Sequence, residues 1–463
     1  MMDWPQFDDP VRNSYRALHR YASAAAPDTV FLDDMQARID AARYLGSDRA
    51  CAAANAARPR VLLLGYHGAG NTGADLRTIE TIAQLRRIFA PREPVLTLFA
   101  LGDVFDHAVL AQTPRLAPTL PYVPDALDAA IREADLVVNV EGSTYTSKFS
   151  DSLSGILIGG IALAHAYGLP AVSYGVDSGA MSEPLTRFVA HHAARAGHVI
   201  CRNAQARVQL RELGVETIAG ADTAWTWRAP ATSPGPHASP SARVAALCPT
   251  NPFWWPVRAD AERARALDAR GETSPHRYGL LHFHTWDGER ERAYEAYLAR
   301  FAAVATALRA RGYTPVIVGM EQVDRAACLD LAARLPFDAA CVVRGERVLD
   351  EVASAVAHAQ CVVTTRYHAS VLALSHGVPV FGLSMDTRID RLLAEADCES
   401  WLAHCDADDA LQRCIDAIDS LEHAGVRERL RAKQRHYAQQ QRAKLDAMGR
   451  RLMAIVAAAG QRV

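Results

Sequence analysis

Short apolar runs alternate with longer segments of helical spacing along most of the 463-residue chain. Apolar strands that alternate with amphipathic helices are typical of a doubly wound parallel sheet with helices on both faces. The pattern therefore predicts an α/β fold with two Rossmann-like domains. The expected strands of the first domain are 60–66, 94–101, 134–142, 169–179, 198–203 and 215–222, and those of the second are 243–249, 278–284, 314–320, 339–345, 359–368 and 378–385.

The two series of strands are separated by residues 229–242, which are rich in Pro, Ser and Ala. Such a composition is typical of an interdomain linker. We therefore expect an N-terminal domain over 59–230 and a C-terminal domain over 243–405. Residues 1–58 are Ala-rich with helical spacing and predict a helical N-terminal extension, and 406–463 predict C-terminal helices.

The amino-acid composition of the chain limits the classes of function that we expect. Half of the residues are hydrophobic and 22% are charged, as in an ordinary globular enzyme, and the net charge of −2 gives no support for nucleic-acid binding. The nine cysteines are scattered without a CxxC pair, so we expect no metal site and no disulfide framework. The first residues lack a secretory pattern, and no apolar run is long enough to span a bilayer, so we expect a cytoplasmic protein.

The segment Cys361–Met385 carries the strongest candidate chemistry. It predicts a buried strand, a tight turn, a short helix and another buried strand, with Arg366 and His368 at the first strand-to-helix junction. Ligands of open α/β sheets bind at the carboxyl ends of strands, and a helix start favours an anion. The pair indicates a site for a small anionic substrate. The alternative is that Arg366 pairs with a carboxylate and His368 is a structural residue of the helix start.

A glycine-rich turn at 65–73, GYHGAGNTG, follows the first strand and precedes a helix. Glycines allow the backbone to approach a ligand closely. The spacing is not that of a dinucleotide fingerprint, and no acidic residue ends the second strand. A tight packing turn explains this segment equally well.

Six motifs occur in an order and spacing that resemble the polysaccharide pyruvyltransferase family. The resemblance runs from about Val61 to Leu393, and its most specific part is the last motif. The motifs read GYHGAGNTG, ADLVVNVEG, AHAYGLPAVSYGVDSG, VICRNAQARVQLRELGV, ADTAW and RYHASVLALSHGVPVFGLSMDTR.

This resemblance implies two Rossmann-like domains that face each other across a cleft, similar to GT-B glycosyltransferases. It also implies phosphoenolpyruvate as the co-substrate without a further cofactor, and a sugar of a polymeric or lipid-linked glycan as the acceptor of a pyruvate ketal. Association with the inner face of a membrane and a homo-oligomer are left open. A GT-B glycosyltransferase that uses a nucleotide sugar, or a non-catalytic glycan-binding relative, remains as an alternative.

By the same resemblance, the donor site contains Arg202, His368 and Arg388, where arginine stands in place of the family's lysine. Arg366 lies beside His368 in the same motif and is expected to bind the donor as well. His368 is the expected proton-transfer residue, because histidine exchanges protons near neutral pH. The alternative is a histidine that only binds phosphate.

The acceptor side of the expected cleft is less well defined. Gly68, Asn71 and Gly73 of the glycine-rich turn are candidates for acceptor contacts. Glu141, at a position where glycine is common, is a candidate base or a helix-start cap. Trp286 is a candidate stacking platform for a sugar, with core packing as the alternative.

Overall fold

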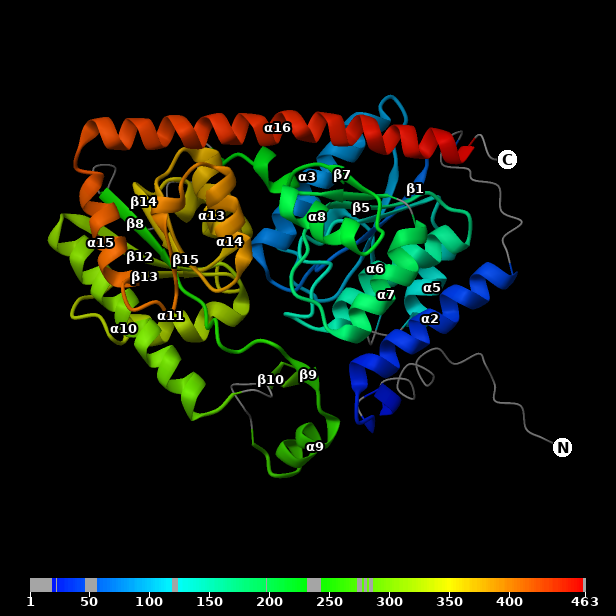
Figure 1. Cartoon of the computed structure of the whole chain (residues 1–463), viewed down its shortest axis with the longest axis horizontal. Helices are drawn as coiled ribbons and strands as arrows, with labels where there is room; N and C mark the ends of the chain where they lie inside the picture. Colours follow the sequence, from blue (N-terminus) through cyan, green and yellow to red (C-terminus); the bar gives the residue numbers. More distant parts are fainter. Residues whose placement is uncertain are drawn as a thin grey trace.

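The computed structural model describes residues 19–21, 23–45, 56–118, 124–196, 198–230, 243–272, 277–278, 281–282 and 286–460. Most of the expected linker 229–242 therefore lies outside the described residues, as do large parts of the expected N-terminal extension. The described chain forms two α/β units that lie side by side (Figure 1).

The first unit is built on a seven-stranded parallel sheet in the order β3-β2-β1-β4-β5-β6-β7. All residues of the central strands β4 and β5 are buried, as expected for a sheet with helices on both faces. The strands are β1 (Arg60–Leu64), β2 (Val95–Phe99), β3 (Arg115–Leu116), β4 (Leu136–Asn139), β5 (Ala171–Val176), β6 (Val199–Cys201) and β7 (Thr217–Ala219).

The helices of this unit include one from the N-terminal extension. Helix α2 packs against α6, where Leu32 and Met35 reach the glycines Gly155 and Gly159 that leave room for them. The helices are α2 (Pro27–Leu45), α3 (Thr72–Phe89), α4 (Ala108–Gln112), α5 (Pro124–Arg132), α6 (Asp151–Ala166), α7 (Glu183–Ala196) and α8 (Ala204–Glu212).

The second unit is built on a six-stranded parallel sheet in the order β13-β12-β8-β14-β15-β16. Its strands are β8 (Arg243–Cys248), β12 (Tyr313–Gly319), β13 (Ala340–Val343), β14 (Cys361–Thr364), β15 (Val380–Ser384) and β16 (Leu402–His404). Its helices are α10 (Gly288–Ala310), α11 (Arg325–Ala332), α12 (Leu349–Ala357), α13 (Tyr367–His376), α14 (Thr387–Glu395) and α15 (Ala410–Ser420).

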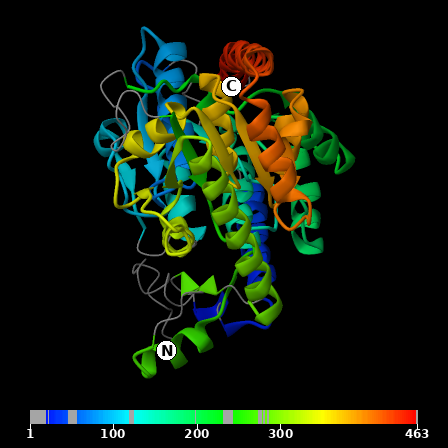
Figure 2. The same cartoon turned by 90° about the vertical axis from the view of Figure 1, so that its left-hand side faces the viewer.

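The expected strand at 278–284 is a wrong prediction. Two short strands, β10 (Arg277–Tyr278) and β11 (Leu281–His282), pair antiparallel with each other, and β11 pairs with β9 (Arg258–Ala259). These three strands form a separate small sheet, which lies with helix α9 (Ala261–Ala269) apart from the two large sheets (Figure 2). An apolar run alone does not distinguish a strand of the main sheet from a local hairpin.

The last helix, α16 (Ala424–Gly460), runs along both units (Figure 1). In the second unit Arg442 donates from Nη2 to the carbonyl of Ser375 at 2.9 Å. In the first unit Gln84 donates from Nε2 to the carbonyl of Leu445 at 2.6 Å. The apolar stripe of this helix is buried against the fold and includes Leu445, Met448 and Leu452. Among the helices of the described residues, none is long and apolar enough to cross a membrane.

Candidate active site between the two sheets

The candidate site lies where turns at the carboxyl ends of strands from the two sheets meet. The turn after β1 contacts the turn after β12 through two backbone hydrogen bonds. Thr72 N donates to Met320 O at 2.9 Å, and Gln322 N donates to Gly70 O at 3.1 Å. The glycine-rich turn of the sequence is thus an interdomain contact, and side chains from both units reach the same space.

Arg366 is the N-cap residue of α13, two residues after the end of β14. Its Nε donates to both carboxylate oxygens of Asp324 at 3.0 Å, and its Nη1 lies 2.9 Å from Glu321 Oε2. The structural alternative is therefore correct in part, because Arg366 does pair with carboxylates. Its side chain nevertheless keeps 13% exposure and lines a cavity.

Glu321 follows β12 and forms a capping box with Asp324. Burial raises the pKa of Glu321 to about 7, although the nearby Arg366 guanidinium acts in the opposite direction. A carboxyl group with a pKa near neutrality can exchange a proton at physiological pH. Glu321 is thus a second titratable group in the site besides His368.

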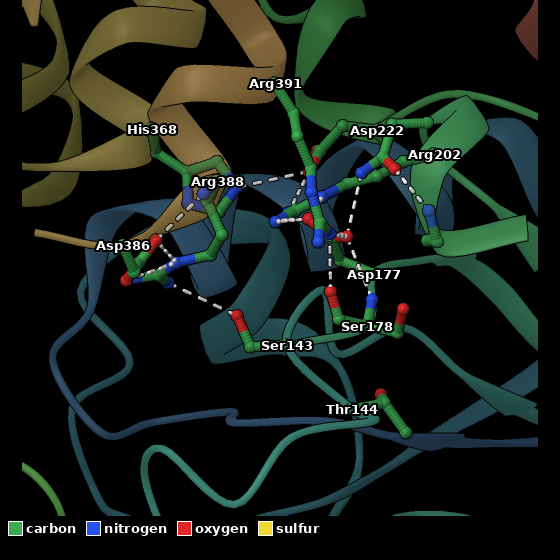
Figure 3. Close-up of polar contacts among 12 residues, drawn as sticks. Ser143, Thr144, Asp177, Ser178, Arg202, Asp222, His368, Asp386, Arg388 and Arg391 are labelled. Carbon is green, nitrogen blue, oxygen red and sulfur yellow. Dashed lines mark hydrogen bonds and ion pairs between the residues drawn. The ribbon is translucent and has the colours of Figure 1, made fainter. Parts of the chain in front are cut away.

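His368 lies in the first turn of α13 and points toward the first unit (Figure 3). Its Nε2 lies 3.4 Å from Asp222 Oδ2, and its Nδ1 faces Gly73 so closely that a Cβ there would come within 1.9 Å. Burial lowers the pKa of His368, whereas the Asp222 carboxylate raises it. The absence of a side chain at Gly73 is therefore what allows the imidazole to occupy this place.

Arg388, near the start of α14, is held by the carboxylate of Asp386 (Figure 3). Its Nη2 donates to Asp386 Oδ2 at 2.7 Å, and its Nη1 donates across the interface to Ser143 Oγ at 3.3 Å. Lys148 Nζ lies 2.6 Å from the same Asp386. Burial lowers the pKa of Lys148 to about 8, against the attraction of Asp386. Two cations thus share one carboxylate, which leaves excess positive charge at this point.

Arg202 belongs to a buried cluster behind the site. Its Nη2 lies 2.7 Å from Asp177 Oδ2 and its Nη1 3.0 Å from Asp222 Oδ2, while its guanidinium packs 3.9 Å from the ring centre of Tyr367. Asp222 also bonds Arg77 Nη1 at 2.6 Å. Burial alone would raise the pKa of Asp222, but Arg77, His368 and Arg202 hold it well below its usual value. The cluster fixes the carboxylate that faces His368.

A cavity of about 110 Å³ brings five of the sequence-predicted residues together. They come from both units and are Asn71, Glu141, Arg366, His368 and Arg388. Asn71 is also the N-cap of α3, since its Oδ1 accepts from Ala74 N, and Glu141 Oε1 accepts from Ser143 N. These five sequence-predicted residues therefore lie around one cavity, and they come from both units.

Four predicted residues do not line this cavity. Arg202 is 2% exposed and lies in the buried cluster, so its predicted direct contact with the donor is not supported by the geometry. Gly68 supports a turn with φ of 74° against Gly102, and Gly73 makes room for His368. Trp286 packs edge to face on Tyr294, with ring centres 6.1 Å apart, which agrees with the core-packing alternative.

The family model described as polysaccharide pyruvyl transferase matches residues 71–387. The chain belongs to this family. No curated protein matches the sequence of this chain.

The overall fold is similar to that of solved structures of the GT-B class. A putative UDP-N-acetylglucosamine 2-epimerase from Listeria monocytogenes matches 88% of this chain and 98% of its own, with 12% identity and a TM-score of 0.54. An Anabaena protein in complex with UDP-glucose matches 87% of this chain and 100% of its own, with 13% identity and a TM-score of 0.49. The TM-score of 0.54 and the two parallel sheets agree with the expected architecture of two Rossmann-like units.

Several site residues of this family member were not predicted from the sequence. Glu321 ends an apolar run, so its position after a buried strand was an available signal. Asp222 was quoted within a motif, but its role became visible only when the fold brought it to His368. Lys148 lines the larger cavity from a loop without a local pattern, whereas Trp255 belongs to the aromatic cluster FWWP at 253–256, for which the sequence leaves both a sugar platform and interdomain packing open. Within the described ranges, no group of three or more His, Cys, Asp or Glu side chains has the arrangement of a metal site.

Proposed function

We propose that this chain transfers the pyruvyl group of phosphoenolpyruvate to two hydroxyls of one sugar and forms a pyruvate ketal on a polymeric or lipid-linked glycan. The observation that carries the proposal is the cavity in which Arg366 and Arg388 converge with His368. Phosphoenolpyruvate carries a phosphate and a carboxylate, and guanidinium groups suit both anions because they donate bidentate hydrogen bonds. The family match supports a transferase of this type.

The two arginines are oriented for such a role. Carboxylates bind the Nε and Nη2 edge of each guanidinium, Asp324 for Arg366 and Asp386 for Arg388. This pairing fixes the side chains before a ligand arrives, which reduces the entropy lost on binding. The Nη1 groups are directed to Glu321 and Ser143, both of which line the cavity.

The reaction requires a proton for the enol methylene of phosphoenolpyruvate. Addition of that proton to C3 and of a first sugar oxygen to C2 breaks the double bond, and the C2–O bond to phosphate then breaks. Hydrogen phosphate leaves, and the second hydroxyl adds to C2 and closes the ring. The two hydroxyl protons balance the methyl group and the hydrogen phosphate, so the reaction as written needs only the two substrates.

His368 is the proposed proton donor. Without ligand its pKa is lowered by burial, so the imidazole is mainly neutral near pH 7. A bound phosphate adds negative charge next to it and raises its pKa, which is the direction needed for an acid. Asp222, behind it, favours the same protonated form. Glu321 and Glu141 are candidates for accepting the hydroxyl protons, because both line the cavity.

A binding assay and a product assay test this proposal. Thermal unfolding is measured with phosphoenolpyruvate and with a panel of nucleotide sugars. A ligand present at about 100 times its dissociation constant adds roughly 2.7 kcal/mol to stability. Incubation of the protein with phosphoenolpyruvate and extracted glycans is followed by mass spectrometry for the ketal. Stabilisation only by nucleotide sugars, with no ketal formed, would contradict the proposal.

A further inference from the structure

A second and larger cavity adjoins the candidate donor site. Its volume is about 580 Å³, within the roughly 300–1,000 Å³ that small-molecule sites occupy, whereas the smaller cavity has about 110 Å³. Four residues line both spaces, namely Ser143, Phe149, Trp255 and Arg388. The two cavities therefore meet beside Arg388, and a molecule in the larger one can present a group to a donor in the smaller one.

Each charged side chain that lines the larger cavity has an ionic partner within the protein. Its cations Lys148 and Arg388 lie 2.6 and 2.7 Å from Asp386. Its other carboxylate, Asp177, is bound by Arg202 and by Arg391. Arg366 and His368 line the smaller cavity and are not among the residues that line this one. The larger cavity's lining of two cations and two carboxylates carries no net charge, which suits a neutral ligand.

The remaining polar lining of this cavity consists largely of hydroxyl groups, which both donate and accept hydrogen bonds. They belong to Ser143, Thr146, Ser147, Ser178, Ser182 and Thr387. Part of the wall is aromatic, since Trp255 packs edge to face on Phe149 with ring centres 5.0 Å apart. Arg388 lies over the Phe149 ring, with its Cζ 5.1 Å from the ring centre. The wall thus runs from the shared arginine to a tryptophan.

We propose that the larger cavity binds the acceptor as a neutral hexopyranose unit of a glycan, with Trp255 as its stacking platform. This inference rests on the proposed function and names the acceptor site for it. The apolar faces of a pyranose ring suit an indole ring, and its hydroxyls suit the hydroxyl-rich wall. Trp255 then takes the role that the sequence had suggested for Trp286, which packs on Tyr294 and lines neither cavity.

The first test compares Trp255→Ala, Trp255→Phe and Trp286→Ala in the full chain. Transfer from phosphoenolpyruvate to a glycan extract is measured by mass spectrometry, and KM is expressed as hexose concentration. We expect Trp255→Ala to raise this KM at least about tenfold, because the sugar ring loses a stacking surface. Trp255→Phe keeps an aromatic ring and should recover most of the loss. Trp286→Ala should have a clearly smaller effect.

The second test blocks the cavity without touching its tryptophan. Ala180 lines the larger cavity, its side chain is exposed, and its carbonyl accepts a hydrogen bond from Ser147 N at 2.9 Å that a side-chain change leaves in place. Ala180→Trp should therefore fold normally, retain donor binding and lose transfer at least about tenfold. Val208→Trp is the matched control, since Val208 is 48% exposed on α8 and lines neither cavity.

The outcomes separate the two proposals. If the wild-type protein forms no ketal, the proposed function fails and this inference fails with it. If the wild type transfers and both Trp255→Ala and Ala180→Trp behave like it, only the acceptor site is wrong. Loss of phosphoenolpyruvate binding in Ala180→Trp would assign the larger cavity to the donor. A larger KM effect for Trp286→Ala than for Trp255→Ala would also overturn the inference.

Discussion

Arg202 and Arg388 both follow strands at the facing edges of the two sheets, but the fold surrounds them differently. Arg202 is 2% exposed and bonds two carboxylates, whereas Arg388 is 20% exposed and lines both cavities. Arg202 therefore belongs to a buried network that holds Asp222 beneath His368. Arg388 keeps one edge available to a ligand. Two arginines at similar positions after a strand thus differ in role, because Arg202 holds other side chains of the site in place and Arg388 lines the cavities directly.

The largest effect is expected for stability when Arg202 is removed. Arg202→Ala leaves Asp177 and Asp222 buried with fewer cationic partners, and breaking a buried ion pair costs about 3–5 kcal/mol. We expect a decrease of this size in the free energy of unfolding, measured by urea denaturation. A stable Arg202→Ala protein that has lost donor binding would instead restore the sequence prediction that Arg202 binds the donor.

His368 connects the buried network to the cavity, and its substitution should affect turnover. His368→Gln keeps hydrogen-bonding capacity but cannot exchange a proton, so we expect turnover to fall at least about 100-fold with a modest loss of donor affinity. His376→Gln is the matched control, because His376 lies on the same helix and packs on Trp227 away from the cavity. Near-normal turnover in His368→Gln would leave this histidine as a ligand only.

Arg388→Ala should weaken donor binding with little change in stability. Hydrogen bonds to charged groups contribute about 1.5–3 kcal/mol, so the dissociation constant for phosphoenolpyruvate should rise roughly 10- to 150-fold. Asp386 keeps Lys148 as a partner in this variant, which limits the cost to folding. Calorimetry measures the affinity. Arg388→Lys should retain part of it, and unchanged affinity in Arg388→Ala would exclude this guanidinium from the donor site.

The smallest effect concerns the pH dependence of stability. Burial raises the pKa of Glu321 to about 7 in the folded protein, above the value of about 4.3 in an unfolded chain. Between these values the folded state holds the proton more tightly, so stability falls as pH rises, with a slope of at most about 1.4 kcal/mol per pH unit. In Glu321→Gln, the free energy of unfolding measured with urea should depend less on pH between pH 5 and 7. The exposed Glu295→Gln should not show this change, and an unchanged slope in Glu321→Gln would refute the assignment.

The short apolar runs between helical segments were enough to predict most strands of the two sheets, because a strand buried on both faces must be apolar throughout. It did not predict the edge strands β3 and β16, which contribute only two and three residues. It also mistook the hairpin of β10 and β11 for a strand of the second sheet.

Within the site, the sequence by itself determined which residues lie where a strand gives way to the following helix. Arg366, His368 and Arg388 follow strands β14 and β15 within one motif, so chain order already places them at one edge of a sheet. Only the tertiary structure decided which charged groups are neutralised. Asp177 and Asp222 pair with Arg202, and Glu321 contacts Asn71. These partners are too far apart in the sequence for a local pattern to predict that they pair. Pairing and burial are properties of the assembled fold, and they decide whether an ionisable group is a ligand or a support.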